Sequence, residues 1–150
     1  MDLAAVAVGA AAGGVLRHAV SSSPRFTAHP GGKLWSIAAI NVVGSALLAS
    51  VACAAPLHPR GRLLLGTGMC GGFTTFSTFA VDVVGLVETR QFATAGRYVI
   101  VNNVGSIVGA AGAVLLLRRY GGLNSLPPPV LHSRSHELVT AAAAKVARRA

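Results

Sequence analysis

The chain has 150 residues, of which 53% are hydrophobic and only 11% are charged, and its mean hydropathy is +0.62. A soluble core of this size does not need so much apolar surface, whereas a small helical membrane protein does. The net charge of +9 does not indicate nucleic-acid binding, because the basic residues are scattered between apolar runs and no stripe interleaves them with aromatics.

The first apolar run covers residues 3–20 and predicts a transmembrane helix. A signal peptide is the alternative, but Asp2 stands where its basic n-region would lie. Gly9 and Gly13 place small residues four apart, a spacing that allows close helix packing in lipid. Arg17, near the far end, is expected to snorkel toward the headgroups.

The second run, residues 34–55, is about 33 Å long as a helix at 1.5 Å per residue, enough to cross a bilayer core. Trp35 beside Lys33 is typical of an interfacial anchor. Asn41 lies roughly two turns into this helix. A side-chain amide at that depth either joins helices together or serves the function, and its position alone leaves both readings open.

The third run, residues 63–87, contains an unusual stretch that reads GTGMCGGFTTFSTFAVD from Gly66 to Asp82. Its clustered glycines disfavour an uninterrupted helix, and hydroxyl and phenyl side chains follow them. Unwound backbone at membrane depth is tolerated only where it is buried in protein or lines a cavity. We therefore predict a third helix that is broken by the glycine-rich stretch, and we expect this stretch to be the working part of the protein.

The fourth helix is predicted over residues 96–117, with Asn102, Asn103 and Ser106 as its polar face. The chain is thus expected to be an all-α membrane protein with one four-helix transmembrane domain over residues 1–119. Residues 120–150 form a basic tail rich in Pro and Ala, which is expected to be disordered or bound at the membrane surface.

The basic residues near the membrane are nearly balanced between its two sides, four against five. With four crossings, one side carries Arg60, Arg62, Arg118 and Arg119, and the other carries Arg17, Arg25, Lys33, Arg90 and Arg97. Because such charges set orientation, this near tie favours insertion in both directions and antiparallel pairing of two copies. The tail charges shift the count toward termini inside if distant charges matter.

The residues do not suggest an enzyme. No Ser/His/Asp or Cys/His set is placed for nucleophilic catalysis, and the glycine-rich stretch lacks the GK[ST] ending of a phosphate loop. Cys53 and Cys70 fall in apolar runs, so neither a disulfide framework nor a metal site of cysteines is indicated. No carboxylate lies mid-membrane, which disfavours a proton-coupled cation or drug transporter.

Neutral hydrogen-bond donors and phenyl rings remain as candidate functional groups. The donors are Asn41, Thr75, Ser77, Thr78 and Ser106. Phe76 and Phe79 are one helical turn apart, and the electropositive edge of a phenyl ring can weakly solvate an anion. This pattern suggests an anion path without a deep ion pair to trap the ion. Packing is the alternative, because Phe pairs at this spacing usually belong to a core.

The segment GMCGGFTTFSTF resembles the signature of the Fluc (CrcB) fluoride channels, and the resemblance extends to INVVGS around Asn41 and NNVGS around Ser106. It covers residues 3–117 approximately, and the tail has no counterpart. The resemblance implies passive export of cytoplasmic fluoride through the cell membrane. It also implies an antiparallel dual-topology homodimer with two pores along the subunit interface.

The family pattern also implies roles for individual residues. Phe76 and Phe79 would form a box whose ring edges face the ions, Asn41 would line the vestibule, and Thr78 and Ser106 would line the pore. Tyr98 matches a pore-associated position less closely, and at a helix start it is equally an interfacial aromatic. Main-chain oxygens of Gly71 and Thr74 would hold a structural sodium ion at the dimer centre.

Two rival readings accompany the fluoride channel. One is a small dual-topology transporter of cations or drugs, and the other is a non-transporting membrane scaffold. Within the channel reading, the charged tail could fix one orientation, so that the functional unit is a heterodimer with an oppositely inserted paralogue. In each case the expected surroundings are membrane lipids, and no nucleic acid is implied.

Overall fold

The computed structural model describes residues 2–53 and 57–121, and within these ranges it is helical with no strand. Four stretches are long and apolar enough to cross a membrane. They are α1 (Asp2–Ser21), α3 (Gly32–Cys53), a composite third span (Pro59–Glu88) and α7 (Phe92–Gly121). The prediction of an all-helical protein with four membrane-spanning helices is confirmed. The predicted tail beyond Gly121 lies outside the described residues.

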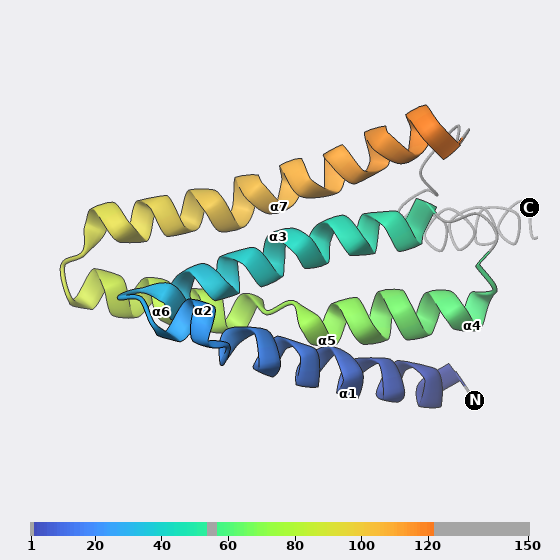
Figure 1. Cartoon of the computed structure of the whole chain (residues 1–150), viewed down its shortest axis with the longest axis horizontal. Helices are drawn as coiled ribbons and strands as arrows, with labels where there is room; N and C mark the ends of the chain where they lie inside the picture. Colours follow the sequence, from blue (N-terminus) through green and yellow to red (C-terminus); the bar gives the residue numbers. More distant parts are fainter. Residues whose placement is uncertain (1, 54–56, 122–150) are drawn as a thin grey trace, which may run out of the picture.

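Consecutive spans run in opposite directions, as Figure 1 shows. The start of α1, the end of α3, the start of the third span and the end of α7 lie at one end of the bundle. The short helix α2 (Pro24–Thr27) and the turn between α6 and α7 lie at the other. The connecting segments therefore alternate between the two ends, as the four-span topology requires.

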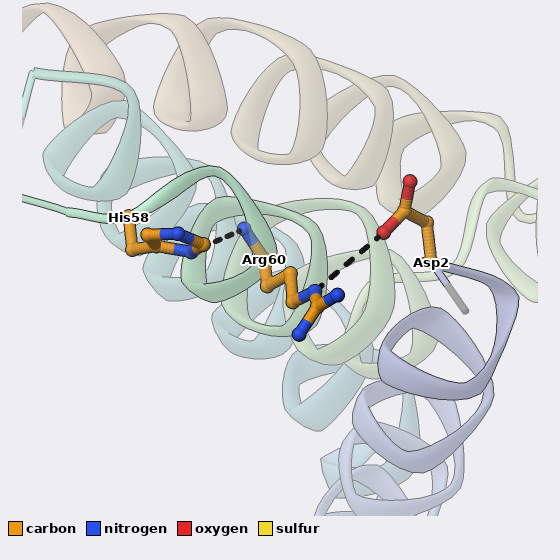
Figure 2. Close-up of polar contacts among 3 residues, drawn as sticks. All are labelled: Asp2, His58 and Arg60. Atoms are coloured by element: carbon orange, nitrogen blue, oxygen red, sulfur yellow. Dashed lines mark hydrogen bonds and ion pairs between the residues drawn. The ribbon is translucent and has the colours of Figure 1, made fainter.

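The third span is assembled from four pieces rather than one helix. It consists of α4 (Pro59–Arg62), the π-helix η1 (Leu63–Cys70), α5 (Gly71–Phe73) and α6 (Phe76–Glu88). At its start the Nδ1 atom of His58 accepts a hydrogen bond of 3.3 Å from the Arg60 amide (Figure 2). The Arg60 side chain lies 4.0 Å from Asp2 at the start of α1. Both partners are exposed, so this ion pair contributes little to stability.

Glycines bring α1 and the third span into backbone contact. Gly9 and Gly13 of α1 are buried, and a Cβ at either position would collide with the backbone of Leu64 or Met69. On the third span, Gly72 plays the same part, because a Cβ at this position would collide with the Ala10 carbonyl. The predicted close packing at Gly9 and Gly13 is confirmed, and these contacts hold the third span rigidly against α1.

The break in the third span lies beyond its glycines. Gly71 has helical backbone angles (φ −64°, ψ −39°), whereas Thr74 (φ −79°, ψ 158°) and Thr75 (φ −151°, ψ 113°) are extended. The expectation that the glycines themselves break the helix is therefore corrected. Gly68 and Gly72 serve close packing against α1, and the chain unwinds at Thr74 and Thr75. The Thr74 N–H keeps its helical bond to the Cys70 carbonyl, whereas the Thr75 N–H donates to Asn41 instead.

Candidate functional site

The unwound backbone at Thr75 is held by the side chain of Asn41 from α3. The Thr75 N–H donates to Asn41 Oδ1 at 2.9 Å, and Asn41 Nδ2 donates to the Thr75 carbonyl at 3.1 Å. One side-chain amide thus pairs with both backbone groups of one residue, as a neighbouring strand would. In an apolar membrane interior this pairing removes the penalty of two unsatisfied peptide groups. Asn41 thus joins α3 to the break and to Asn102 of α7, whereas its role in the function stays a prediction.

The side chain of Thr75 starts the next helix. Its Oγ1 accepts a hydrogen bond from the Thr78 N–H at 3.3 Å, which makes Thr75 the N-cap of α6. The same hydroxyl donates to Thr78 Oγ1 at 3.0 Å and lies 3.3 Å from Ser77 Oγ. The candidate pore residue Thr78 is therefore placed directly beside the break, although its hydroxyl is engaged with Thr75.

The break also leaves main-chain carbonyls without their usual helical donors, among them those of Gly71 and Thr74. In a continuous α-helix the Thr75 N–H would bond to Gly71 and the Thr78 N–H to Thr74. Here these two N–H groups donate to Asn41 and to the Thr75 hydroxyl instead. The Thr74 carbonyl accepts from Arg17 Nη1 at 3.3 Å. Arg17 thus reaches inward to the break, and the expectation that it snorkels to the headgroups is wrong.

A row of aromatic rings extends from the break toward the far end of the bundle. The centroids of Phe76 and Phe79 are 5.4 Å apart, and those of Phe79 and Tyr98 are also 5.4 Å apart. Trp35 meets Tyr98 edge-on at 6.3 Å. Phe79 and Tyr98 are buried, whereas the Phe76 ring is 74% exposed on the single chain. Tyr98 is therefore a buried support for Phe79 and not an exposed interfacial aromatic.

The hydroxyl of Tyr98 donates to Asp82 Oδ2 at 3.0 Å. Asp82 lies in α6, two turns beyond the break, and is partly buried. The sequence pattern gave Asp82 no role, because only the fold places it opposite a tyrosine sixteen residues further along the chain.

A groove of about 310 Å³, mainly apolar with polar groups at intervals, opens beside the break between α3, α6 and α7. Its lining residues include Asn41, Ser45, Thr74, Thr75, Phe76, Phe79, Asn102, Asn103 and Ser106. Among the predicted site residues, Asn41, Thr74, Phe76, Phe79 and Ser106 line this groove. Gly71, Thr78 and Tyr98 do not. None of the lining residues is ionisable, so the groove offers partial charges and no fixed charge.

Three groove residues had only weak signals in the sequence. Ser45 follows Asn41 by four residues and so shares its helix face, which a periodicity argument finds. Asn102 and Asn103 were recognised as a polar face of the fourth helix but were not assigned to the site. The two residues are neighbours in the sequence but point to different sides of α7: Asn102 is buried against Asn41, and Asn103 is exposed.

Four membrane-length helices with an interrupted third span define a multi-pass membrane protein. Residues 4–114 match the family model described as CrcB-like protein, Camphor Resistance (CrcB), and the chain therefore belongs to this family. The resemblance that the third-span motif indicated is confirmed.

Relatives of known name cover the same part of the chain. A protein named Fluoride-specific ion channel FluC 1 from Halobacterium salinarum is 45% identical over 112 residues, 74% of this chain and 86% of the relative. Proteins named Fluoride-specific ion channel FluC from Sphingopyxis alaskensis and Bordetella avium are 35% and 38% identical. These matches cover 76% of this chain in both cases, and 93% and 94% of the relatives. The relatives are named as ion channels, which confirms the expectation of a non-enzyme.

Proposed function

We propose that this protein is a fluoride-selective channel of the cell membrane that lets cytoplasmic fluoride leave passively. The observation that carries the proposal is the groove at the break, which presents hydroxyls, the exposed amide of Asn103 and the rings of Phe76 and Phe79 without an ionisable group. Such a lining can replace the hydration of a small anion without trapping it in an ion pair. The names of the relatives at 35–45% identity point to the same ion.

The direction of transport follows from simple electrostatics. Fluoride enters acidified cells as neutral HF, dissociates at cytoplasmic pH and is trapped there as the anion. An inside-negative membrane potential drives an anion outward through any selective leak. A passive channel therefore suffices, and no coupling acid is needed within the span.

The functional unit in this proposal is an antiparallel dimer with two pores at its interface. The single chain leaves the Phe76 ring 74% exposed beside an open groove, so a second copy is needed to enclose the path. The near balance of basic residues between the two ends of the bundle supports insertion in both orientations. A heterodimer with an oppositely inserted paralogue would satisfy the same geometry.

A structural sodium ion fits the released carbonyls. Na⁺ is a hard cation that prefers oxygen ligands, and the break frees the carbonyls of Gly71 and Thr74 from their helical donors. No atom lies near the position of a Cβ at Gly71, so this side of the span is open to a partner. Two subunits would supply four such oxygens. The Arg17 contact occupies one lone pair of the Thr74 carbonyl and leaves the second.

The test is anion efflux from liposomes that contain only this purified protein, with fluoride and chloride compared at matched gradients. The proposal expects rapid fluoride efflux and chloride efflux close to that of empty liposomes. Equal efflux of both ions would reject fluoride selectivity. If neither ion moves, coexpression with a candidate paralogue distinguishes the heterodimer from a wrong assignment of function.

A further inference from the structure

Asn102 lies at the centre of a hydrogen-bond network that joins α7, α3 and the break. Its Oδ1 accepts a hydrogen bond of 2.8 Å from Asn41 Nδ2, and its own Nδ2 donates to the Tyr98 carbonyl at 3.1 Å. The side chain is 5% exposed, which is unusual for an amide in a membrane helix unless it is fully bonded. Asn102 therefore connects the helix that carries Tyr98 to the residue that holds Thr75.

The donors and acceptors of this network permit only one orientation of each amide. The Thr75 N–H requires an acceptor, so Asn41 must present Oδ1 to it and Nδ2 to the Thr75 carbonyl. The second hydrogen of Asn41 Nδ2 then requires an acceptor on α7. Asn102 supplies it, because donation from its Nδ2 to the Tyr98 carbonyl turns Oδ1 toward Asn41. The amide orientations are thus fixed by backbone groups: the Thr75 N–H can only donate, and the carbonyls of Thr75 and Tyr98 can only accept.

This network consumes both amide hydrogens of Asn41. Asn41 therefore has no side-chain N–H left to offer a passing anion in this arrangement, and its task at the groove is to hold the Thr75 peptide extended. The extended Thr75 in turn sets the start of α6, on which Phe76 and Phe79 stand. A change in the orientation of the Asn41 amide would therefore displace Thr75 and, with it, the rings of Phe76 and Phe79.

Asn103 shows what an asparagine in this helix does without such a role. Its Nδ2 donates to the Val99 carbonyl at 2.8 Å, one turn back in its own helix, and the side chain is exposed. Asn102 makes the equivalent bond to Tyr98 and adds the contact to Asn41. The difference between the two neighbours is the contact to α3.

We propose that Asn102 is a positioning residue that acts on the permeation path through Asn41, by keeping the Asn41 amide turned toward the Thr75 peptide. Its effect on transport rests on the proposed fluoride channel, whereas its effect on the Thr75 backbone does not. It holds the break in shape rather than coordinating the ion.

A double-mutant cycle on fluoride efflux tests the transport part, using Asn41→Ala, Asn102→Ala and the double variant in the full chain. Each single variant removes the Asn41–Asn102 hydrogen bond together with the other side-chain bonds of the replaced residue, and we expect efflux to fall by roughly tenfold or more in each. If Asn102 acts through Asn41, the double variant is no slower than Asn41→Ala alone. Independent losses that multiply to about a hundredfold would overturn the proposal, because Asn102 would then act on the ion directly.

Amide hydrogen exchange at Thr75, measured by NMR in lipid nanodiscs, tests the backbone part without any transport. Asn102→Ala is expected to speed Thr75 exchange at least ~10-fold, because the N–H loses a fixed acceptor. Asn102→Asp keeps an acceptor oxygen opposite Asn41 but loses the donor to the Tyr98 carbonyl, so Thr75 should be better protected than in Asn102→Ala and less well than in the wild-type protein. Asn103→Ala is the matched control and should leave Thr75 protected.

Unchanged Thr75 exchange in Asn102→Ala would overturn the positioning role whatever the efflux shows. If exchange rises as expected while the wild-type protein carries no fluoride, the network stands and the proposed function fails. The two experiments therefore separate an error in the role of Asn102 from an error in the function.

Discussion

The ring of Phe79 packs against the ring of Tyr98, with centroids 5.4 Å apart and planes tilted by 50°. On its other side Phe79 meets Phe76 at the same separation, so the middle ring is held between one anchored and one exposed neighbour. Tyr98 is anchored by its hydrogen bond to Asp82. The orientation of the Phe79 ring in the groove thus depends on the hydrogen bond between Tyr98 and Asp82, which Phe79 itself does not make.

Tyr98→Phe tests this support, because it keeps the ring and removes the donor to Asp82. A partly buried carboxylate without its partner costs about 1–3 kcal/mol, so we expect a lower thermal unfolding temperature in detergent. Asp82→Asn is the control, since its amide oxygen can still accept the Tyr98 hydroxyl and most of the stability should remain. Equal destabilisation by both variants would contradict the hydrogen bond as the support.

Phe79→Ile tests the role of the ring edge in the groove. Isoleucine fills a similar volume but has no electropositive edge, so fluoride efflux should fall by at least ~10-fold while the protein stays assembled. Phe73→Ile is the matched control: Phe73 is equally buried in the same span but does not line the groove. Efflux from liposomes and size-exclusion profiles are measured for both. Wild-type efflux in Phe79→Ile would favour simple packing for this ring.

Asn41→Asp places a carboxylate where the amide now donates to the Thr75 carbonyl and to Asn102. The change removes both donated hydrogen bonds and adds a charge that repels the permeant anion. We expect loss of fluoride efflux to near background and a lowered thermal stability. Asn41→Ala separates the two effects, because it removes the bonds without adding the charge. If Asn41→Asp conducts as well as Asn41→Ala, charge repulsion is not part of the mechanism.

The sequence predicted the number and order of the spans because each apolar run is long enough to cross a bilayer and is bounded by charged or turn-forming residues. It also selected Asn41, Phe76, Phe79 and Ser106, which do share one groove. The break lies within the predicted stretch but at its threonines rather than its glycines, because glycine clusters indicate either unwinding or close packing and only the neighbour α1 decides between them. Asn102 and Asp82 were not assigned roles from the sequence, because each acts through a hydrogen bond to a residue on another helix, which only the fold reveals.

Removal of sodium tests the proposed ion at the released carbonyls. With Na⁺ replaced by a large organic cation on both sides, two sets of carbonyl oxygens would face one another without a cation between them. We therefore expect fluoride efflux to fall and the thermal stability of the proposed dimer to drop, with both restored by adding Na⁺. Replacement of Na⁺ by K⁺ is the control for ionic strength and for ion size. Unchanged efflux and stability without Na⁺ would reject the site.

The contact between α1 and the third span is tested by two adjacent glycines. A Cβ at Gly13 would collide with the backbone at Met69 and Phe73, whereas a Cβ at Gly14 meets no atom within 4 Å. Gly13→Ala should therefore destabilise the protein by about 1–3 kcal/mol, because backbone cannot give way as a flexible side chain can. The same change at Gly14 should be neutral or stabilising, by up to ~1 kcal/mol, through helix propensity alone.

Thermal unfolding in detergent, followed by loss of the assembled peak in size exclusion, compares the two variants directly. The comparison is well matched, since the substitutions are identical, sit one residue apart and carry the same change in intrinsic propensity. A lower unfolding temperature for Gly13→Ala alone supports the backbone contact between α1 and the third span. Equal effects at both positions would show that α1 does not pack through Gly13, and the rigid support of the break would then have to come from α3 alone.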